Sequence, residues 1–356
     1  MWRVSVLTVA SGIRYFRQMT NETPQPSPKL FFETINAYQR TAAITAAIEL
    51  DVFTAIGEGG ATAAEVAKRS GASPRGTRIL CDYLTLLGFL TKSDDRYSLT
   101  PDSAMFLSRK SPAYAGGVTK FLLSGTVTRG FEKLSDAVRK GGTADTELGT
   151  TAAEHPVWVE FARAMAPLMM PGSQALAEMM PVDGSRPGKV LDISASHGMW
   201  GIAFAKKYPR ASVVAVDWAP VLEVARENAQ HAGVADRFSA IAGNAFEVDL
   251  GSDYDVALIP NFLHHFNMED CVRFLRRVHG ALRDGGRVAI PEFVPNPDRV
   301  SPPESAGFSL IMLATTPEGD AYTFPEYQEM LHRSGFASPE ACPLPPISTA
   351  IIASKK

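Results

Sequence analysis

Two adjacent histidines, His264 and His265, follow an apolar segment at residues 254–260 and precede a helix that Asn267 and Asp270 can cap. A neutral imidazole, with a pKa of about 6.5, can take a proton from a hydroxyl group as the oxygen attacks an electrophile. A phenol has a pKa of about 10, and removing its proton at neutral pH without a base costs about 4 kcal/mol. The pair therefore predicts a general base. Two alternatives stay open. One is a metal site, although adjacent histidine side chains point in divergent directions and no carboxylate lies at a ligand spacing nearby. The other is a buried pair with a purely structural role.

A run of mostly small residues, DISASHG at 192–198, lies between a predicted strand and a predicted helix. Small side chains let the backbone approach a ligand, and a helix N-terminus favours a carboxylate or a phosphate. Asp217 ends the next predicted strand, 25 positions after Asp192. A carboxylate at that place can accept both ribose hydroxyls of an adenosine ligand, and capping the following helix is its alternative role. The nicotinamide fingerprint GxGxxG is absent, because Ser194 and Ser196 stand at its first two glycine positions.

The segment GNAF at 243–246 closes the third predicted strand. Asn244 is suited to bind the amine of adenine, and Phe246 is suited to cover the ring. The residues predicted to bind an adenosine cofactor are Asp192, Ser194, Ser196, Gly198, Asp217, Trp218, Gly243, Asn244, Ala245, Phe246 and Asn261.

Alternating strands and helices must position these residues. From residue 189 onward, predicted strands alternate with predicted helices through short connections, which is typical of a parallel sheet covered on both faces. The strands are predicted at 189–194, 212–217, 238–243, 254–260 and 286–293, and the helices at 199–208, 219–232 and 268–282. A helix at 324–334 and a last edge strand at 347–353 complete the pattern.

Residues 29–110 predict helices followed by a hairpin, which together suggest a winged helix. Thr62 and Glu65 form a capping box, and Ser73 with Pro74 can begin the next helix. A DNA-recognition helix needs a polar and basic face, and here only Arg75 and Arg78 qualify. The pattern therefore favours a structural or dimerisation unit that does not bind nucleic acid. The apolar segment 31–48 is expected to bury itself in a partner subunit.

Residues 111–180 read as helical and rich in methionine, and residues 181–188 read as a linker. A stripe of methionines and aromatic residues is usually core, although thioethers also suit a pocket for a flat apolar ligand. The predicted division is 1–28 as a disordered or non-native start, 29–110 as the dimerisation unit, 111–180 as a helical linker and pocket segment, and 181–356 as the cofactor domain. The predicted pocket walls are Met165, Met169, Phe266, Phe308 and Met312.

Composition sets further bounds. A chain of 356 residues with 45% hydrophobic residues has ample material for two domains, and its net charge of -3 gives no general attraction to nucleic acid or acidic membranes. Cys81, Cys271 and Cys342 lack a CxxC spacing, so neither a disulfide framework nor a zinc site is expected, and a cytoplasmic location fits best. Residues 1–10 resemble a weak signal sequence. A simpler interpretation is that translation begins at Met19. No apolar run reaches the roughly 18–20 residues of a membrane span.

These motifs together resemble the bacterial branch of the plant-type small-molecule O-methyltransferases, the caffeic acid and hydroxyindole O-methyltransferase-like family. The resemblance covers the chain from about residue 30 onward and rests on VLDISASHG at 190–198, Asp217, GNAF at 243–246, NFLHHF at 261–266, GGRV at 285–288 and YTF at 322–324. It implies a homodimer in which a winged-helix dimerisation domain precedes a class I domain that binds S-adenosylmethionine. It also implies that His264 is the catalytic base and that Glu292, at the end of the fifth strand, orients it.

The sequence departs from the family pattern at four positions. Ser194 and Ser196 replace the first two glycines of DxGxGxG, and serine is expected to keep the turn if its φ is negative. Asn244 replaces an acidic residue. Ala321 stands where a second carboxylate flanks the base, with Asp320 beside it as a substitute.

The sequence thus predicts an α/β, S-adenosylmethionine-dependent O-methyltransferase that acts on a hydroxyl of a small aromatic or polyketide-like metabolite, with no metal and no membrane. One alternative is methyl transfer to carbon or nitrogen, or use of the cofactor without methyl transfer. Another is a winged-helix regulator that senses a small molecule.

Overall fold

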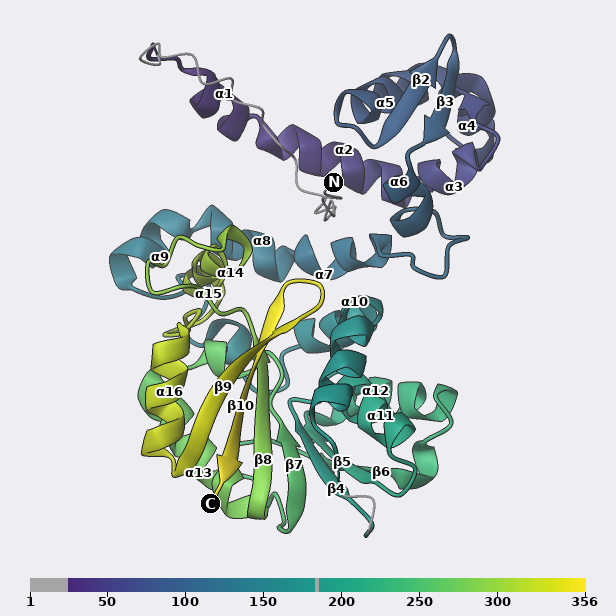
Figure 1. Cartoon of the computed structure of the whole chain (residues 1–356). Helices are drawn as coiled ribbons and strands as arrows, with labels where there is room; N and C mark the ends of the chain where they lie inside the picture. Colours follow the sequence, from purple (N-terminus) through teal and green to yellow (C-terminus); the bar gives the residue numbers. More distant parts are fainter. Residues whose placement is uncertain (1–24, 183–185) are drawn as a thin grey trace, which may run out of the picture.

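The computed structural model describes residues 25–182 and 186–356. The prediction for residues 1–28 and the signal-like segment therefore fall mostly or wholly outside the described residues. Figure 1 shows a small helical unit, a row of connecting helices and a large sheet with helices on both sides. The predicted α/β class with a helical N-terminal unit is confirmed.

The N-terminal unit packs its helices around a three-stranded sheet of order β1-β3-β2. The predicted capping box is present: the backbone N–H of Glu65 donates to Thr62 Oγ1 (3.3 Å), and that of Thr62 to Glu65 Oε2 (2.7 Å). The predicted hairpin is present as β2 and β3. The elements are α1 Lys29–Ile35, α2 Ala37–Glu49, α3 Val52–Ile56, β1 Ala61–Thr62, α4 Ala63–Ser70, α5 Pro74–Leu86, β2 Leu90–Ser93, β3 Arg96–Leu99 and α6 Pro101–Phe106.

Short helices lead from this unit to one long helix, α10, that lies against the sheet domain (Figure 1). Its C-terminal half packs on α11 and its N-terminal half on the start of α12. The connecting elements are η1 Gly116–Val118, α7 Thr119–Leu122, α8 Gly125–Glu132, α9 Leu134–Lys140, η2 Gly149–Thr151 and α10 Val157–Met179.

The large domain is a seven-stranded sheet of order β6-β5-β4-β7-β8-β10-β9. Side chains alternate between its faces: Leu191 packs toward α13 and α16, and its neighbour Val190 toward α10 and α11. The elements are β4 Lys189–Ile193, α11 Met199–Lys207, β5 Ser212–Asp217, α12 Ala219–His231, η3 Ala235–Arg237, β6 Phe238–Ala242, β7 Tyr254–Leu258, η4 Leu263–His265, α13 Met268–Ala281, β8 Leu282–Glu292, α14 Pro303–Ala306, α15 Phe308–Thr315, α16 Phe324–Arg333, β9 Phe336–Leu344 and β10 Ser348–Lys355.

Two sheet predictions were wrong. The sheet is mixed rather than wholly parallel, since β10 pairs antiparallel with both β8 and β9. The strand predicted at 347–353 is therefore internal, and β9 is the edge. Pro339 and Pro343 argue against a strand when the sequence is considered alone, so β9 was not predicted. Both prolines are tolerated because an edge strand needs fewer backbone donors.

The strand order reverses beside β4, because β5 and β6 lie on one side of it and β7 and β8 on the other. In open sheets of this kind, ligands bind outside the carboxyl ends of the strands at such a reversal. In the parts of the chain that the structure describes, no helix is both long and apolar enough to cross a membrane.

Candidate active site

His264 and Glu292 form a buried pair at the carboxyl ends of β7 and β8. These strands are parallel neighbours, so the η4 turn after β7 lies beside the last residue of β8. His264 Nδ1 lies 2.5 Å from Glu292 Oε2, and the two side chains are 4% and 0% exposed. A carboxylate can only accept, so Nδ1 carries the proton and donates it to this hydrogen bond. The opposite ring nitrogen, Nε2, is left with a lone pair, as a base requires.

His265 differs from His264 in its partner. Its Nδ1 donates to the backbone carbonyl of Phe262 at 3.2 Å, and its ring packs against Trp158 of α10 at 5.1 Å between centroids. Burial, and then the neighbouring His264, lower the pKa of His265 well below its ordinary value. His265 is therefore neutral and hydrogen-bonded to a carbonyl. Of the two histidines, only His264 is hydrogen-bonded to a carboxylate. Within the described residues, no cluster of three or more potential metal-binding side chains is present.

Aromatic side chains surround this pair. Phe308 of α15 packs edge-on against His264, with 4.8 Å between the ring centroids, and Phe293 stacks on Phe308 at 4.3 Å. With Trp158 on the side of His265, these rings place flat apolar surfaces around the histidines. Trp158 and Phe293 were not predicted as site residues. Trp158 lies in the helical segment rich in methionine and aromatic residues, and no local signal connects it to a turn about 100 residues away.

Asp217 is held at the end of β5 by two backbone groups. Its Oδ2 accepts from the N–H of Ser196 at 2.8 Å and its Oδ1 from that of Trp218 at 2.7 Å. Trp218, and not Asp217, occupies the N-cap position of α12, so capping does not explain the carboxylate. Burial raises the pKa of Asp217 to about 6, although the two N–H groups favour the charged form. Each carboxylate oxygen retains acceptor capacity for a ligand hydroxyl.

The turn after β4 corrects one expectation. Ser194 and Ser196 have φ values of +53° and +51°, where a negative φ was expected. The turn keeps the left-handed conformation that glycine adopts readily, and each serine bears a strain of about 1 kcal/mol or more. Gly198, at φ +74°, continues the turn into α11. Below it, Asp192 Oδ2 accepts from the N–H of Gly201 at 2.8 Å, and burial, followed by the charge of Asp217, raises the pKa of Asp192 to about 8.

Buried polar atoms without a partner gather at this end of the sheet. Among the described residues, eight buried side-chain nitrogen or oxygen atoms lack a hydrogen-bond partner, and five of them follow or end strands β4, β7 and β8. A buried polar group without a partner is rare and destabilising. The residues here thus fit a polar ligand that supplies the missing partners. The five atoms are Asp192 Oδ1, Ser196 Oγ, His197 Nε2, Asn261 Oδ1 and Glu292 Oε1.

The segment that follows β6, residues 243–246, packs against an aromatic cluster. Gly243 has a φ of +138°, and a Cβ there would lie 2.7 Å from Val248 Cγ1, so glycine is required. Asn244 already bonds locally: its Oδ1 accepts from the N–H of Phe246 (3.0 Å), and its Nδ2 donates to Glu247 Oε1 (2.9 Å). The ring of Phe246 packs among other phenylalanines, Phe262, Phe266 and Phe274. Ala245 is buried beside them.

The structure brings some predicted pocket walls to the histidines and places others elsewhere. Phe308 contacts His264, and Met312 lies buried one turn further along α15. Phe266 packs into the aromatic cluster under Phe246, and Met169 packs on the core between α10, α11 and the sheet. Met165 is half-buried on α10.

The proposed substitute carboxylate is engaged elsewhere. Asp320 Oδ2 accepts from Arg299 Nη1 at 3.1 Å, and its Oδ1 accepts from the backbone N–H of Ala321. Ala321 is fully buried. Glu292 is thus the carboxylate that the structure places on His264.

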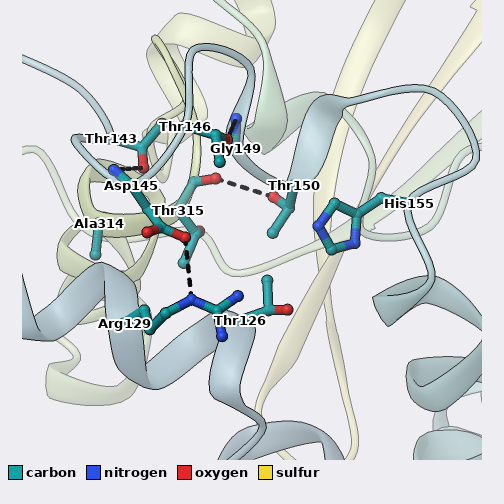
Figure 2. A pocket seen from close by; sticks show the side chains of 10 residues that line it. All are labelled: Thr126, Arg129, Thr143, Asp145, Thr146, Gly149, Thr150, His155, Ala314 and Thr315. Atoms are coloured by element: carbon teal, nitrogen blue, oxygen red, sulfur yellow. Dashed lines mark hydrogen bonds and ion pairs between the residues drawn. The ribbon is translucent and has the colours of Figure 1, made fainter.

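A small polar pocket lies behind Trp158. Figure 2 shows Arg129 of α8 pointing toward Asp145, with Thr150 and His155 on the other side. Trp158 Nε1 donates to the carbonyl of Thr150, which lines this pocket, at 3.0 Å, and the Trp158 ring also packs against His265.

The seven-stranded sheet and the polar site at the carboxyl ends of β4, β5 and β7 define a class I methyltransferase. A family model described as the O-methyltransferase domain matches residues 131–337, and one described as the O-methyltransferase dimerisation domain matches residues 32–109. The chain belongs to this O-methyltransferase family. It transfers a methyl group to oxygen and uses S-adenosylmethionine as the donor.

Known proteins resemble the chain over most of its length. A provisionally assigned O-methyltransferase from Nostoc punctiforme has a solved structure with 53% identity and a TM-score of 0.90, covering 93% of this chain and 100% of that one. Human N-acetylserotonin methyltransferase, solved in complex with S-adenosylmethionine, shares the fold at 24% identity and a TM-score of 0.80, covering 95% and 99%. The 3-hydroxy-5-methyl-1-naphthoate 3-O-methyltransferase of Streptomyces sahachiroi is 29% identical over 331 residues, 88% of this chain and 93% of its own length.

Proposed function

We propose that this enzyme methylates a phenolic hydroxyl on a small, flat aromatic or polyketide-like metabolite, with His264 as the general base. The observation that carries the proposal is the buried His264–Glu292 hydrogen bond of 2.5 Å. Glu292 fixes the tautomer in which Nε2 can take a proton, and its charge stabilises the imidazolium that forms. Deprotonating a phenol at neutral pH costs about 4 kcal/mol without such a base.

The aromatic surroundings support a flat acceptor. Phe308 lies against His264 and Trp158 against His265, so a planar ring can pack between apolar faces while its hydroxyl meets the base. The naphthoate methyltransferase of Streptomyces sahachiroi, a relative over most of its length, acts on such a ring.

We assign the cofactor to the carboxyl ends of β4, β5 and β6. S-adenosylmethionine supplies the electrophilic methyl group when it is bound. The carboxylate of Asp217 would accept the ribose hydroxyls, because both of its oxygens keep acceptor capacity. The left-handed turn at Ser194 and Ser196 would let the backbone come close to the ligand, and Gly243 with Phe246 would flank the adenine.

We propose a homodimer built through α1 and α2. These helices expose a set of large apolar side chains that no other part of the described chain covers, Leu30, Phe31, Phe32, Ile35 and Tyr38. An exposed apolar set of this size marks an interaction surface. It falls at the start of the region that matches the dimerisation domain.

The N-terminal unit serves this assembly rather than nucleic-acid binding. Of the two basic residues expected on α5, Arg78 is paired with Asp82 at 2.9 Å, and Lys92 also binds Asp82 at 2.6 Å. The Asp82 carboxylate reduces the positive charge that phosphate contacts would need. The three cysteines are free, which fits a reducing cytoplasm.

A labelled-methyl assay tests the proposed acceptor. The full chain is incubated with methyl-labelled S-adenosylmethionine and matched sets of acceptors: hydroxylated aromatic rings, their O-methyl ethers, and the corresponding anilines. Label transferred to oxygen of the free phenols, and absent from the ethers, is the expected result. Label on ring carbon or on aniline nitrogen, or consumption of cofactor without methylated product, would contradict the proposal.

A further inference from the structure

His197 is a buried side chain in the turn that follows β4, and it takes no part in the proposed reaction. It lies between β4 and α11, is 1% exposed, and follows Ser196, whose backbone N–H holds Asp217. Its Nε2 is buried and has no hydrogen-bond partner among the described residues. A buried donor without an acceptor is costly, and a phenylalanine of similar shape would avoid that cost.

The hydrogen bonds of His197 fix its tautomer. Its Nδ1 accepts from the backbone N–H of Met199 at 3.1 Å, so the ring proton sits on Nε2. Burial lowers the pKa of His197 to about 3, which keeps the ring neutral at physiological pH. His197 is therefore a fixed, neutral N–H donor whose acceptor must come from outside the described chain.

The ring contacts place this donor at the active site. Phe161 of α10 stacks on the imidazole, with 6.2 Å between centroids and 18° between planes. Phe161 packs edge-on against Trp158, and Trp158 against His265. His197 thus stands at one end of an aromatic row whose other end is the histidine beside the base.

We propose that His197 Nε2–H binds the α-carboxylate of the methionyl part of S-adenosylmethionine. That carboxylate is the anionic acceptor of the cofactor, whereas its ammonium and sulfonium groups cannot accept. His197 precedes Gly198, the N-cap of α11, a nine-residue helix whose N-terminus also favours an anion. This inference rests on the proposed cofactor site, because it assumes that Asp217 holds the ribose.

Two ligands separate the role of His197 from that of Asp217. S-adenosylhomocysteine carries the amino-acid part, and 5′-methylthioadenosine shares its thioether, ribose and adenine but lacks that part. Calorimetry gives both dissociation constants for the wild type and three variants. His197→Phe keeps the ring and loses the donor, Asp217→Asn changes the ribose acceptor, and His279→Phe is a matched control on a ring that packs against Phe336.

Loss of a hydrogen bond to a charged group should weaken S-adenosylhomocysteine binding by about 10- to 100-fold in His197→Phe, with 5′-methylthioadenosine changed less than about threefold. Asp217→Asn should weaken both ligands, and His279→Phe neither. Equal losses for the two ligands in His197→Phe, or no loss, would overturn the proposal. A wild type that binds neither ligand would overturn the cofactor site and the role of His197 with it.

A measurement on the unaltered protein covers the case in which His197→Phe fails to fold. In ¹⁵N-histidine-labelled wild type, the Nε2–H resonance of His197 should move on addition of S-adenosylhomocysteine and stay in place with 5′-methylthioadenosine. The same shift with both ligands, or no shift with either, would refute the assignment. Thermal unfolding of ligand-free His197→Phe serves only as a folding check, because the substitution removes the unsatisfied Nε2–H and also the Nδ1 acceptor of the Met199 N–H.

Discussion

Cofactor affinity should fall as the pH drops through the pKa of Asp217. Burial raises that pKa to about 6, and a carboxylate must be ionised to accept two ribose hydroxyls with full strength. At pH 8 the group is almost fully ionised, whereas at pH 5, one unit below the pKa, about one molecule in eleven is ionised. The dissociation constant of S-adenosylhomocysteine should therefore be about tenfold higher at pH 5 than at pH 8, a loss of about 1.4 kcal/mol.

Calorimetry at pH 8, 6 and 5 on the wild type and Asp217→Asn measures this effect. The variant should bind about 2–4 kcal/mol more weakly at pH 8, because two charge-assisted hydrogen bonds are lost, and its affinity should vary less with pH. It retains Asp192, whose pKa is also raised, so any slope that survives in the variant belongs to other groups. Wild-type affinity that is equal at pH 8 and pH 5, or an equal slope in both proteins, would refute the assignment of Asp217.

Three further predictions concern strain, assembly and the carboxylate behind the base. Ser194→Gly and Ser196→Gly should each raise the free energy of unfolding by about 1 kcal/mol, because glycine adopts positive φ without strain; a lower midpoint in urea denaturation would contradict this. Phe31→Glu should convert the dimer to a monomer in light scattering at micromolar concentration, and an unchanged mass would locate the interface elsewhere. Glu292→Gln should lower the turnover rate about tenfold, because a neutral hydrogen bond replaces a charge-assisted one to His264; an unchanged rate would show that the charge is not used.

Local patterns made the strand ends predictable. Asp217 and His264 stand directly after apolar segments, and in a sheet built from alternating strands and helices those ends share one edge. The pairing of Glu292 with His264 came from family resemblance, and the parallel register of β7 and β8 explains it physically. Helix starts such as Thr62 were readable because a capping box depends on only four residues.

Features that depend on torsion angles or on distant packing were not predictable. Ser194 and Ser196 are small enough for either sign of φ, and the sequence does not reveal which one the turn adopts. The aromatic row from His197 through Phe161 and Trp158 to His265 joins a helix to two loops that lie about 35 and 105 positions away in the sequence, so only the tertiary fold creates it. His197 is part of the motif at 192–198, yet its proposed role depends on one buried nitrogen without a hydrogen-bond partner. The spacing of residues in the sequence does not reveal such an atom.

The role of His264 as the general base can be tested by one comparison of turnover rates. On an acceptor verified by product analysis, His264→Ala should lower the rate by about 10²- to 10⁴-fold, while its affinity for S-adenosylhomocysteine stays close to that of the wild type. His265→Ala should lose less, because its imidazole has a carbonyl partner rather than a carboxylate. A loss below about tenfold in His264→Ala would mean that alignment alone drives the transfer, and a larger loss in His265→Ala would mean that the other histidine is the base.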